Sequence, residues 1–137
     1  MSRRTARDYA YKLIFQSLFH ATDDADESEA ASMYADPSLS DEDKAYMRDV
    51  VGGVSAHEEE LKAVIVRNLH NFTYERIFKP DLAALLLACY EIKYTSIPAA
   101  VSISEVVDLV KTYSSPTSGK FVNGVLAGVY KETEDRQ

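Results

Sequence analysis

Apolar residues are most concentrated in residues 80–94, PDLAALLLACYEIKY, where they run almost without interruption. Across the eleven residues from Leu82 to Ile92, the only charged side chain is Glu91. The Leu and Ala content favours a helix, and the segment is too long for an ordinary strand. A helix that is apolar on every side must be buried on every side, and this one is far shorter than the roughly 20 residues of a membrane span. We therefore predict a buried central helix around which the other helices pack.

Outside this segment, apolar residues recur at three- and four-residue spacing, which is the pattern of amphipathic helices. Ser2 is predicted to cap an opening helix that runs to about His20. The inward-facing sets are Ala6, Ala10, Leu13, Ile14, Ser17 and Leu18 in that helix, then Met47, Val50, Val51 and Val54, then Leu61, Val64, Ile65, Leu69 and Phe72, then Val106, Val107, Val110 and Tyr113, and finally Phe121, Val122, Val125, Leu126 and Val129. The sequence has no runs that alternate apolar and polar residues, so the pattern predicts an all-α fold.

Polar and turn-forming residues predict helix boundaries in the first half of the chain. Ser40, followed by Asp43, resembles a capping box at the start of a helix. The acidic residues 21–36 before it are predicted to form a linker with a short helix at about 27–34, which ends before Pro37.

In the second half, the predicted boundaries follow Ser and Gly residues. Ser102 or Ser104 is expected to cap a helix that runs through Tyr113. Residues 114–119, SSPTSG, are predicted to form a turn, and the last helix is expected to begin near Lys120.

Four glycines lie inside predicted helices, where glycine is less favourable than alanine. Gly52 and Gly53 are explained by a bend or by a close helix contact. Gly124 and Gly128 are explained by the close approach of another backbone. These positions are therefore predicted bends or packing contacts.

The charge of the chain is unevenly distributed. Its 137 residues, enough for one domain with a real core, carry a net charge of −7. Nine acidic residues and no basic residue fall within residues 21–43, leaving 13 acidic and 15 basic residues elsewhere. The acidity therefore belongs to one segment and does not exclude a nucleic-acid partner. Cys89 is the single cysteine and the three histidines lack metal-binding spacing, so we expect a cytoplasmic protein without disulfides, metal or cofactor.

The candidate binding residues are basic side chains at two predicted helix starts. Arg3, Arg4 and Arg7 lie in the first turns of the opening helix, where they oppose the helix dipole at a cost of about a few tenths of a kcal/mol or more. A solvated surface is one explanation, but the placement favours a site where guanidinium groups hold phosphate. Lys120, at the predicted start of the last helix, is a further candidate for phosphate binding. The preceding turn lacks the pattern of a phosphate-binding loop, which argues against a nucleoside triphosphate site.

Several segments of the chain resemble the NusB family of bacterial transcription antitermination factors. They are RRTARDYAYKLIFQ, RDVVGGV, LACYEI, and IPAAVSISEVVDLVKTY followed by GKFVNGVL. The resemblance covers nearly the whole chain in order and is weakest at residues 21–40. It implies an all-α fold of about seven helices, in two small helical bundles packed around a buried central helix. We expect a single domain over residues 1–137, with sub-bundles at about 1–72 and 73–137.

The resemblance also implies a function. Members of the family bind the boxA element of single-stranded nascent RNA with the ribosomal protein NusE, and this assembly modifies RNA polymerase so that it reads through terminators, notably in ribosomal RNA operons. On this basis the expected RNA-binding residues are Arg3, Arg4, Arg7, Lys120, Phe121 and Asn123. The NusE contact is expected near Arg76 and Asp81, at the start of the central helix. Leu86 and Thr117 stand where relatives often carry an arginine and a polar or acidic residue, which predicts weaker RNA binding.

Three functions are open at this point. The preferred one is an RNA-binding adaptor that is not an enzyme. The second is a helical protein-binding scaffold or homodimer without direct RNA binding. The third, an RNA-modifying enzyme, is disfavoured because 137 residues leave no room for a cofactor loop or a catalytic domain. Individual residues also have plainer explanations: Phe121 as core, Asn123 as a local cap, and Arg76 and Asp81 as surface residues without a partner.

Overall fold

The computed structural model describes residues 2–19 and 24–135. Over these residues it consists of seven α-helices and one short 3-10 helix, without strands. The elements are α1 (Ser2–Ser17), α2 (Asp24–Tyr34), α3 (Asp41–Ala56), α4 (Glu58–Arg67), η1 (Tyr74–Arg76), α5 (Lys79–Tyr94), α6 (Ala99–Tyr113) and α7 (Pro116–Asp135). The predicted all-α fold is therefore confirmed. Among the described helices, none is long and apolar enough to cross a membrane.

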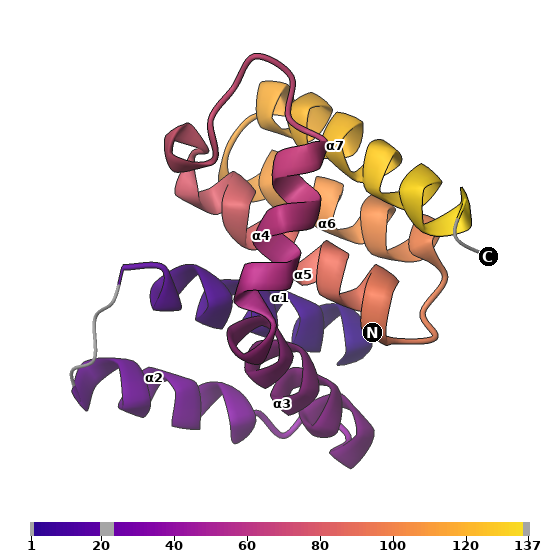
Figure 1. Cartoon of the computed structure of the whole chain (residues 1–137). Coiled ribbons are helices and arrows are strands. Elements are labelled where there is room, and N and C mark those ends of the chain that lie inside the picture. The colour runs from indigo at the N-terminus through magenta and orange to yellow at the C-terminus, as the bar shows by residue number, and fades with distance from the viewer. Residues whose placement is uncertain (1, 20–23, 136–137) are drawn as a thin grey trace.

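Helix α5 is the enclosed centre of the molecule. Every residue from Asp81 to Glu91 is buried, and α5 packs against α1, α3, α4, α6 and α7. Figure 1 shows α5 with α1 on one side and α6 with α7 on the other. Pro80 lies in the first turn, where its missing N–H is not needed. The predicted central helix is thus confirmed, whereas the division into two sub-bundles stays a prediction because α5 contacts helices of both halves.

The predicted boundaries in the first half agree with the structure in part, and Ser2, predicted as a cap, is the first residue of α1. The Ser40 hydroxyl accepts the Asp43 N–H at 3.1 Å, and the Asp43 carboxylate accepts the Ser40 N–H at 3.3 Å, which confirms the capping box. Helix α2 is longer than predicted but ends before Pro37, as predicted. Helix α1 ends at Ser17, and the end predicted near His20 lies outside the described residues.

Two helices in the second half begin earlier than predicted. Helix α6 follows Pro98 directly, so Ser102 lies inside the helix rather than capping it. Helix α7 begins at Pro116, because proline suits a first turn and the Ser115 hydroxyl accepts the Ser118 N–H at 3.1 Å. Lys120 consequently lies in the second turn of α7 and not at its N-terminus.

The predicted inward faces are buried or half-buried at all but three positions. Ser17, Phe72 and Tyr113 are exposed, Phe72 by 44% and Tyr113 by 47%. Phe72 follows the end of α4 at Arg67, so the helical spacing no longer turns it inward. Tyr113 is the last residue of α6, and its ring stacks on Tyr11 with 5.9 Å between centroids.

The glycines divide into two kinds. A Cβ at Gly53 would overlap the Tyr90 ring of α5, and a Cβ at Gly128 would overlap the Asn68 side chain. A Cβ at Gly52 or Gly124 would meet no atom within 4 Å. The expected close approach is confirmed at Gly53. At Gly128 it comes from a side chain rather than a backbone, and at Gly124 the expectation is wrong.

The two adjacent glycines of α3 offer a matched test of this packing. Gly53→Ala should lower the free energy of unfolding by about 1–3 kcal/mol, since Tyr90 is held by a hydrogen bond to Asp49 at 2.8 Å and must shift. Gly52→Ala should raise it by about 0.5–1 kcal/mol, because alanine favours helix and space is open. Urea unfolding measures both, and equal effects of the two substitutions would contradict the packing described here.

Candidate nucleic-acid interface

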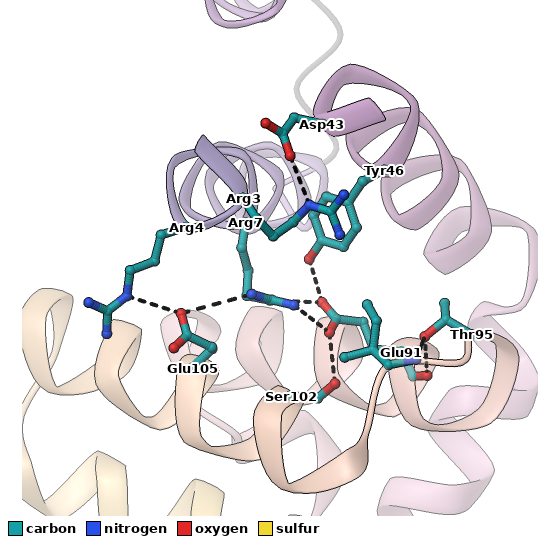
Figure 2. A network of polar contacts seen from close by, with 10 residues as sticks. Arg3, Arg4, Arg7, Asp43, Tyr46, Glu91, Thr95, Ser102 and Glu105 are labelled. Carbon is teal, nitrogen blue, oxygen red and sulfur yellow. Dashed lines mark hydrogen bonds and ion pairs between the residues drawn. The ribbon is translucent and has the colours of Figure 1, made fainter. Parts of the chain in front are cut away.

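The buried carboxylate of Glu91 connects the start of α1 to α5 (Figure 2). Glu91 has no solvent-exposed surface. Arg7 donates to it through two guanidinium nitrogens, Nε at 3.1 Å and Nη2 at 3.0 Å. The Tyr46 hydroxyl of α3 and the Ser102 hydroxyl of α6 donate to the same carboxylate, the latter at 2.7 Å. These donors from three helices satisfy a charge that would be costly to bury alone.

This network makes Arg7 a structural residue. Its side chain is 5% exposed and also lies 3.8 Å from the Glu105 carboxylate. Burial lowers the pKa of the Arg7 guanidinium, but the hydrogen bond to Glu91 and the electrostatic effects of Tyr46, Glu91 and Glu105 together outweigh burial and leave the pKa raised. The predicted role of Arg7 as an RNA contact conflicts with this placement, because its donors point inward to a partner 84 residues away in sequence.

Arg3 lies closer to the surface, beside the start of α3. Its Nε donates to Asp43 at 2.9 Å, and its guanidinium lies over the Tyr46 ring, 4.6 Å from the centroid. Tyr46 therefore contacts Arg3 through its ring and Glu91 through its hydroxyl (Figure 2). Burial and then the charge of Glu91 raise the pKa of the Tyr46 phenol, so the hydroxyl stays a donor.

Arg4 is the most exposed of the three predicted arginines, with 64% of its side chain open to solvent. It reaches across to α6, where its Nε donates to Glu105 and its Nη2 to Asp108, each at 3.2 Å. Arg4 stands on the wall of a cavity of about 780 Å³ between α1 and α6. The same cavity is lined by the basic residues Lys12 and Lys111.

The cavity leads along α1 towards the start of α7. Near this end, the Tyr113 ring lies 5.1 Å from the Lys12 ammonium, and its hydroxyl donates to Asp8 at 2.8 Å. Lys111 lies against α7, since a Cβ at Gly119 would come within 3.0 Å of its side-chain carbons. The neighbour of Gly119 in sequence is the predicted phosphate contact Lys120.

The predicted residues of α7 are partly accessible. Lys120 and Asn123 are exposed, whereas Phe121 is half-buried with its ring 5.5 Å from that of Phe72. Helix α7 meets α5 near Asp81, because Ser118 donates to that carboxylate at 3.1 Å. Asp81 and Glu91 are ten residues apart on α5, which corresponds to about 15 Å. The basic start of α1 and the start of α7 therefore lie near opposite ends of α5, with the cavity leading from one towards the other.

The two predicted partner-binding residues differ in their surroundings. Arg76 is exposed in η1, whereas Asp81 is 5% exposed, and its Oδ1 has no hydrogen-bond partner among the described residues. Burial raises the pKa of the Asp81 carboxyl, and the hydrogen bond from Ser118 offsets this in part. At Pro80, the neighbour of Asp81 in sequence, lies a small apolar cavity of about 260 Å³, lined by Tyr11, Lys12, Phe15, Pro80 and Tyr113.

Sequence reasoning missed the acidic partners of the arginines. Glu91 was visible as the lone charge in an apolar helix, and a buried carboxylate requires a buried cation. That requirement could have assigned one arginine to the core. Glu105 and Asp108 carried no comparable signal, because acids on an amphipathic helix ordinarily face solvent.

The arrangement is that of a small all-α protein built around one enclosed helix, with a basic helix start beside a surface cavity. The family model described as NusB family matches residues 4–131, and the chain belongs to this family. It is 38% identical to the transcription antitermination protein NusB of Listeria monocytogenes, with 96% of this chain and 98% of the relative covered.

Two solved structures share the fold. The T. maritima NusB structure has a TM-score of 0.84 and 30% identity, and the match covers 96% of this chain and 92% of that chain. A structure of the antitermination factors NusB and NusE in complex with dsRNA has a TM-score of 0.81 and 26% identity. The match covers 96% of this chain and 97% of that chain.

Proposed function

We propose that this protein is a transcription antitermination factor that binds RNA together with the ribosomal protein NusE. The observation that carries the proposal is the pair of surface arginines at the start of α1, Arg3 and Arg4, with Arg4 on the wall of a cavity that Lys12 and Lys111 also line. Relatives named as NusB antitermination proteins, and the similar structure that contains NusE and RNA, support it. The proposed ligand is the boxA element of nascent RNA, and the assembly acts on RNA polymerase in the cytoplasm, notably at ribosomal RNA operons.

In this proposal the RNA strand follows the cavity between α1 and α6. Arg4 and Arg3 hold phosphates at one end, and Lys120 holds a phosphate near the other. Phe121, with Phe72 beside it, offers a ring on which a base can stack, and Asn123 offers an amide for hydrogen bonding. Arg7 is left out of the ligand contacts because Glu91 holds its donors. Its role is to fix the start of α1.

The NusE contact is proposed at the start of α5. The small apolar cavity beside Pro80 gives a partner an aromatic surface, to which the exposed Tyr113 ring contributes. Asp81 follows Pro80 in sequence and has an oxygen that lacks a donor among the described residues, and Arg76 adds an exposed charge in η1. The proposed activity is binding without catalysis.

A salt titration tests the RNA contacts. Replacing Arg3 and Arg4 together by alanine should weaken binding of a boxA-type oligonucleotide. It should also flatten the log–log dependence of affinity on salt by about 0.7 per lost phosphate contact on a single strand. Phe121→Ala should cost about 1–3 kcal/mol of binding without changing the slope, because stacking releases no counterions. Single-stranded and duplex forms of the oligonucleotide are titrated in parallel, since the similar complex contains duplex RNA.

Arg67→Ala is the matched control for this titration. Arg67 is also an ion-paired surface arginine, held by Glu132 of α7, and its loss removes one positive charge, against two in the double variant. It should leave the salt slope of each RNA form unchanged. If the double arginine variant behaves like Arg67→Ala, the protein acts instead as a scaffold or homodimer without direct RNA contact.

The partner proposal is tested by thermodynamic coupling. Purified NusE should increase the affinity for boxA-type RNA, and RNA should increase the affinity for NusE by the same factor. Calorimetric titrations in both orders measure the two factors. An RNA affinity that is identical with and without NusE would contradict joint binding.

A further inference from the structure

The guanidinium of Arg4 has its best phosphate-binding edge occupied by two carboxylates. In arginine the Nε–H and one Nη–H point in the same direction and form a fork that fits a carboxylate or a phosphate. In Arg4 the Nε lies 3.2 Å from Glu105 and the Nη2 lies 3.2 Å from Asp108. A phosphate that binds this edge must therefore displace at least one of the two acids.

The two acids differ in how firmly they are held. Glu105 is mostly buried, with 22% of its side chain exposed, and it also contacts the buried Arg7 at 3.8 Å. Asp108 is 54% exposed and pairs with Arg4 through a single hydrogen bond. Exposed ion pairs of this kind are weak and are weakened further by salt. Asp108 is therefore the acid that an incoming phosphate displaces, and Glu105 stays in place.

The position of Asp108 also places its charge where the ligand would pass. Both Arg4 and Asp108 line the cavity between α1 and α6, together with Lys12 and Lys111. A phosphate in this cavity meets the repulsion of Asp108 in addition to competing with it for Arg4. Both effects act in the same direction and reduce affinity.

We propose that Asp108 is an intramolecular competitor of RNA phosphate at Arg4, and that it sets the affinity of the interface. This inference rests on the proposed function, because it takes Arg4 as an RNA contact. It adds an affinity-determining acid on α6 that does not itself hold RNA. When RNA binds, the Arg4–Asp108 ion pair is exchanged for an Arg4–phosphate ion pair.

A double-mutant cycle on Arg4 and Asp108 tests the exchange, with a single-stranded boxA-type oligonucleotide titrated at low and at high salt. Asp108→Asn keeps the shape of the side chain and removes its charge, so RNA should bind about two- to fivefold more tightly at low salt. The gain should shrink at high salt, where the ion pair is already screened. Arg4→Ala should weaken binding, and Asp108→Asn added to Arg4→Ala should bring a smaller gain than in the unmodified protein, because only the direct repulsion is then relieved.

Glu59→Gln is the matched control, because it removes one acidic charge from an exposed position on α4, which packs on α3, α5 and α7. An equal gain from Glu59→Gln and Asp108→Asn would overturn the inference while leaving the proposed function intact. The inference is also overturned, with the proposed function intact, if Asp108→Asn tightens binding equally in the protein with Arg4 and in the Arg4→Ala variant. If Arg4→Ala leaves RNA affinity unchanged, the proposed contact fails and the inference fails with it. Circular dichroism of each variant confirms that folded proteins are compared.

Discussion

The buried carboxylate of Glu91 is the constraint on which the arrangement of the molecule depends. An ionised group inside an apolar helix is tolerated only when a cation and hydrogen-bond donors surround it. Here the donors come from α1, α3 and α6, so satisfying one carboxylate brings three helices together around α5. Apolar burial alone would hold these helices together with less control over their relative positions, because the hydrophobic effect is not directional.

The same network explains why the three arginines of α1 have different roles. Arg7 is turned inward and fixes α1, which places Arg3 and Arg4 at the surface beside α3 and α6. Tyr46 links the buried network to the surface arginine Arg3, since its hydroxyl donates to Glu91 and its ring lies against the Arg3 guanidinium. The candidate ligand contacts thus stand on a rigid support, which is what keeps charged side chains in a defined geometry for a partner.

Much of the fold could be predicted from the sequence because it depends on local patterns. The enclosed α5 follows from an apolar run without a polar face, and the start of α3 follows from the Ser40 capping box. The start of α7 was misread because Pro116 and the small polar residues around it favour both turns and helix starts. Whether a proline opens a helix is decided by the cap, which Ser115 supplies.

The site was less predictable, because its chemistry depends on contacts between distant parts of the chain. Nothing local distinguishes Arg7 from Arg3 and Arg4, and only the packing of α1 on α5 decides which one meets Glu91. The acids that pair with Arg4 lie more than 100 residues away in sequence. Helix spacing predicts which face of a helix is buried, but it does not reveal which charge on another helix will meet it.

The free energy of unfolding of arginine variants tests this division of roles most directly. Arg7→Ala should lower it by about 3–5 kcal/mol, because Glu91 is left as a buried charge without its cation. Adding Glu91→Gln to Arg7→Ala should restore part of the loss. Arg4→Ala, at an exposed ion pair, should cost no more than about 1 kcal/mol. Equal small effects of Arg7→Ala and Arg4→Ala in urea unfolding would contradict the account, since Arg7 would then not be the residue that holds α1 in place.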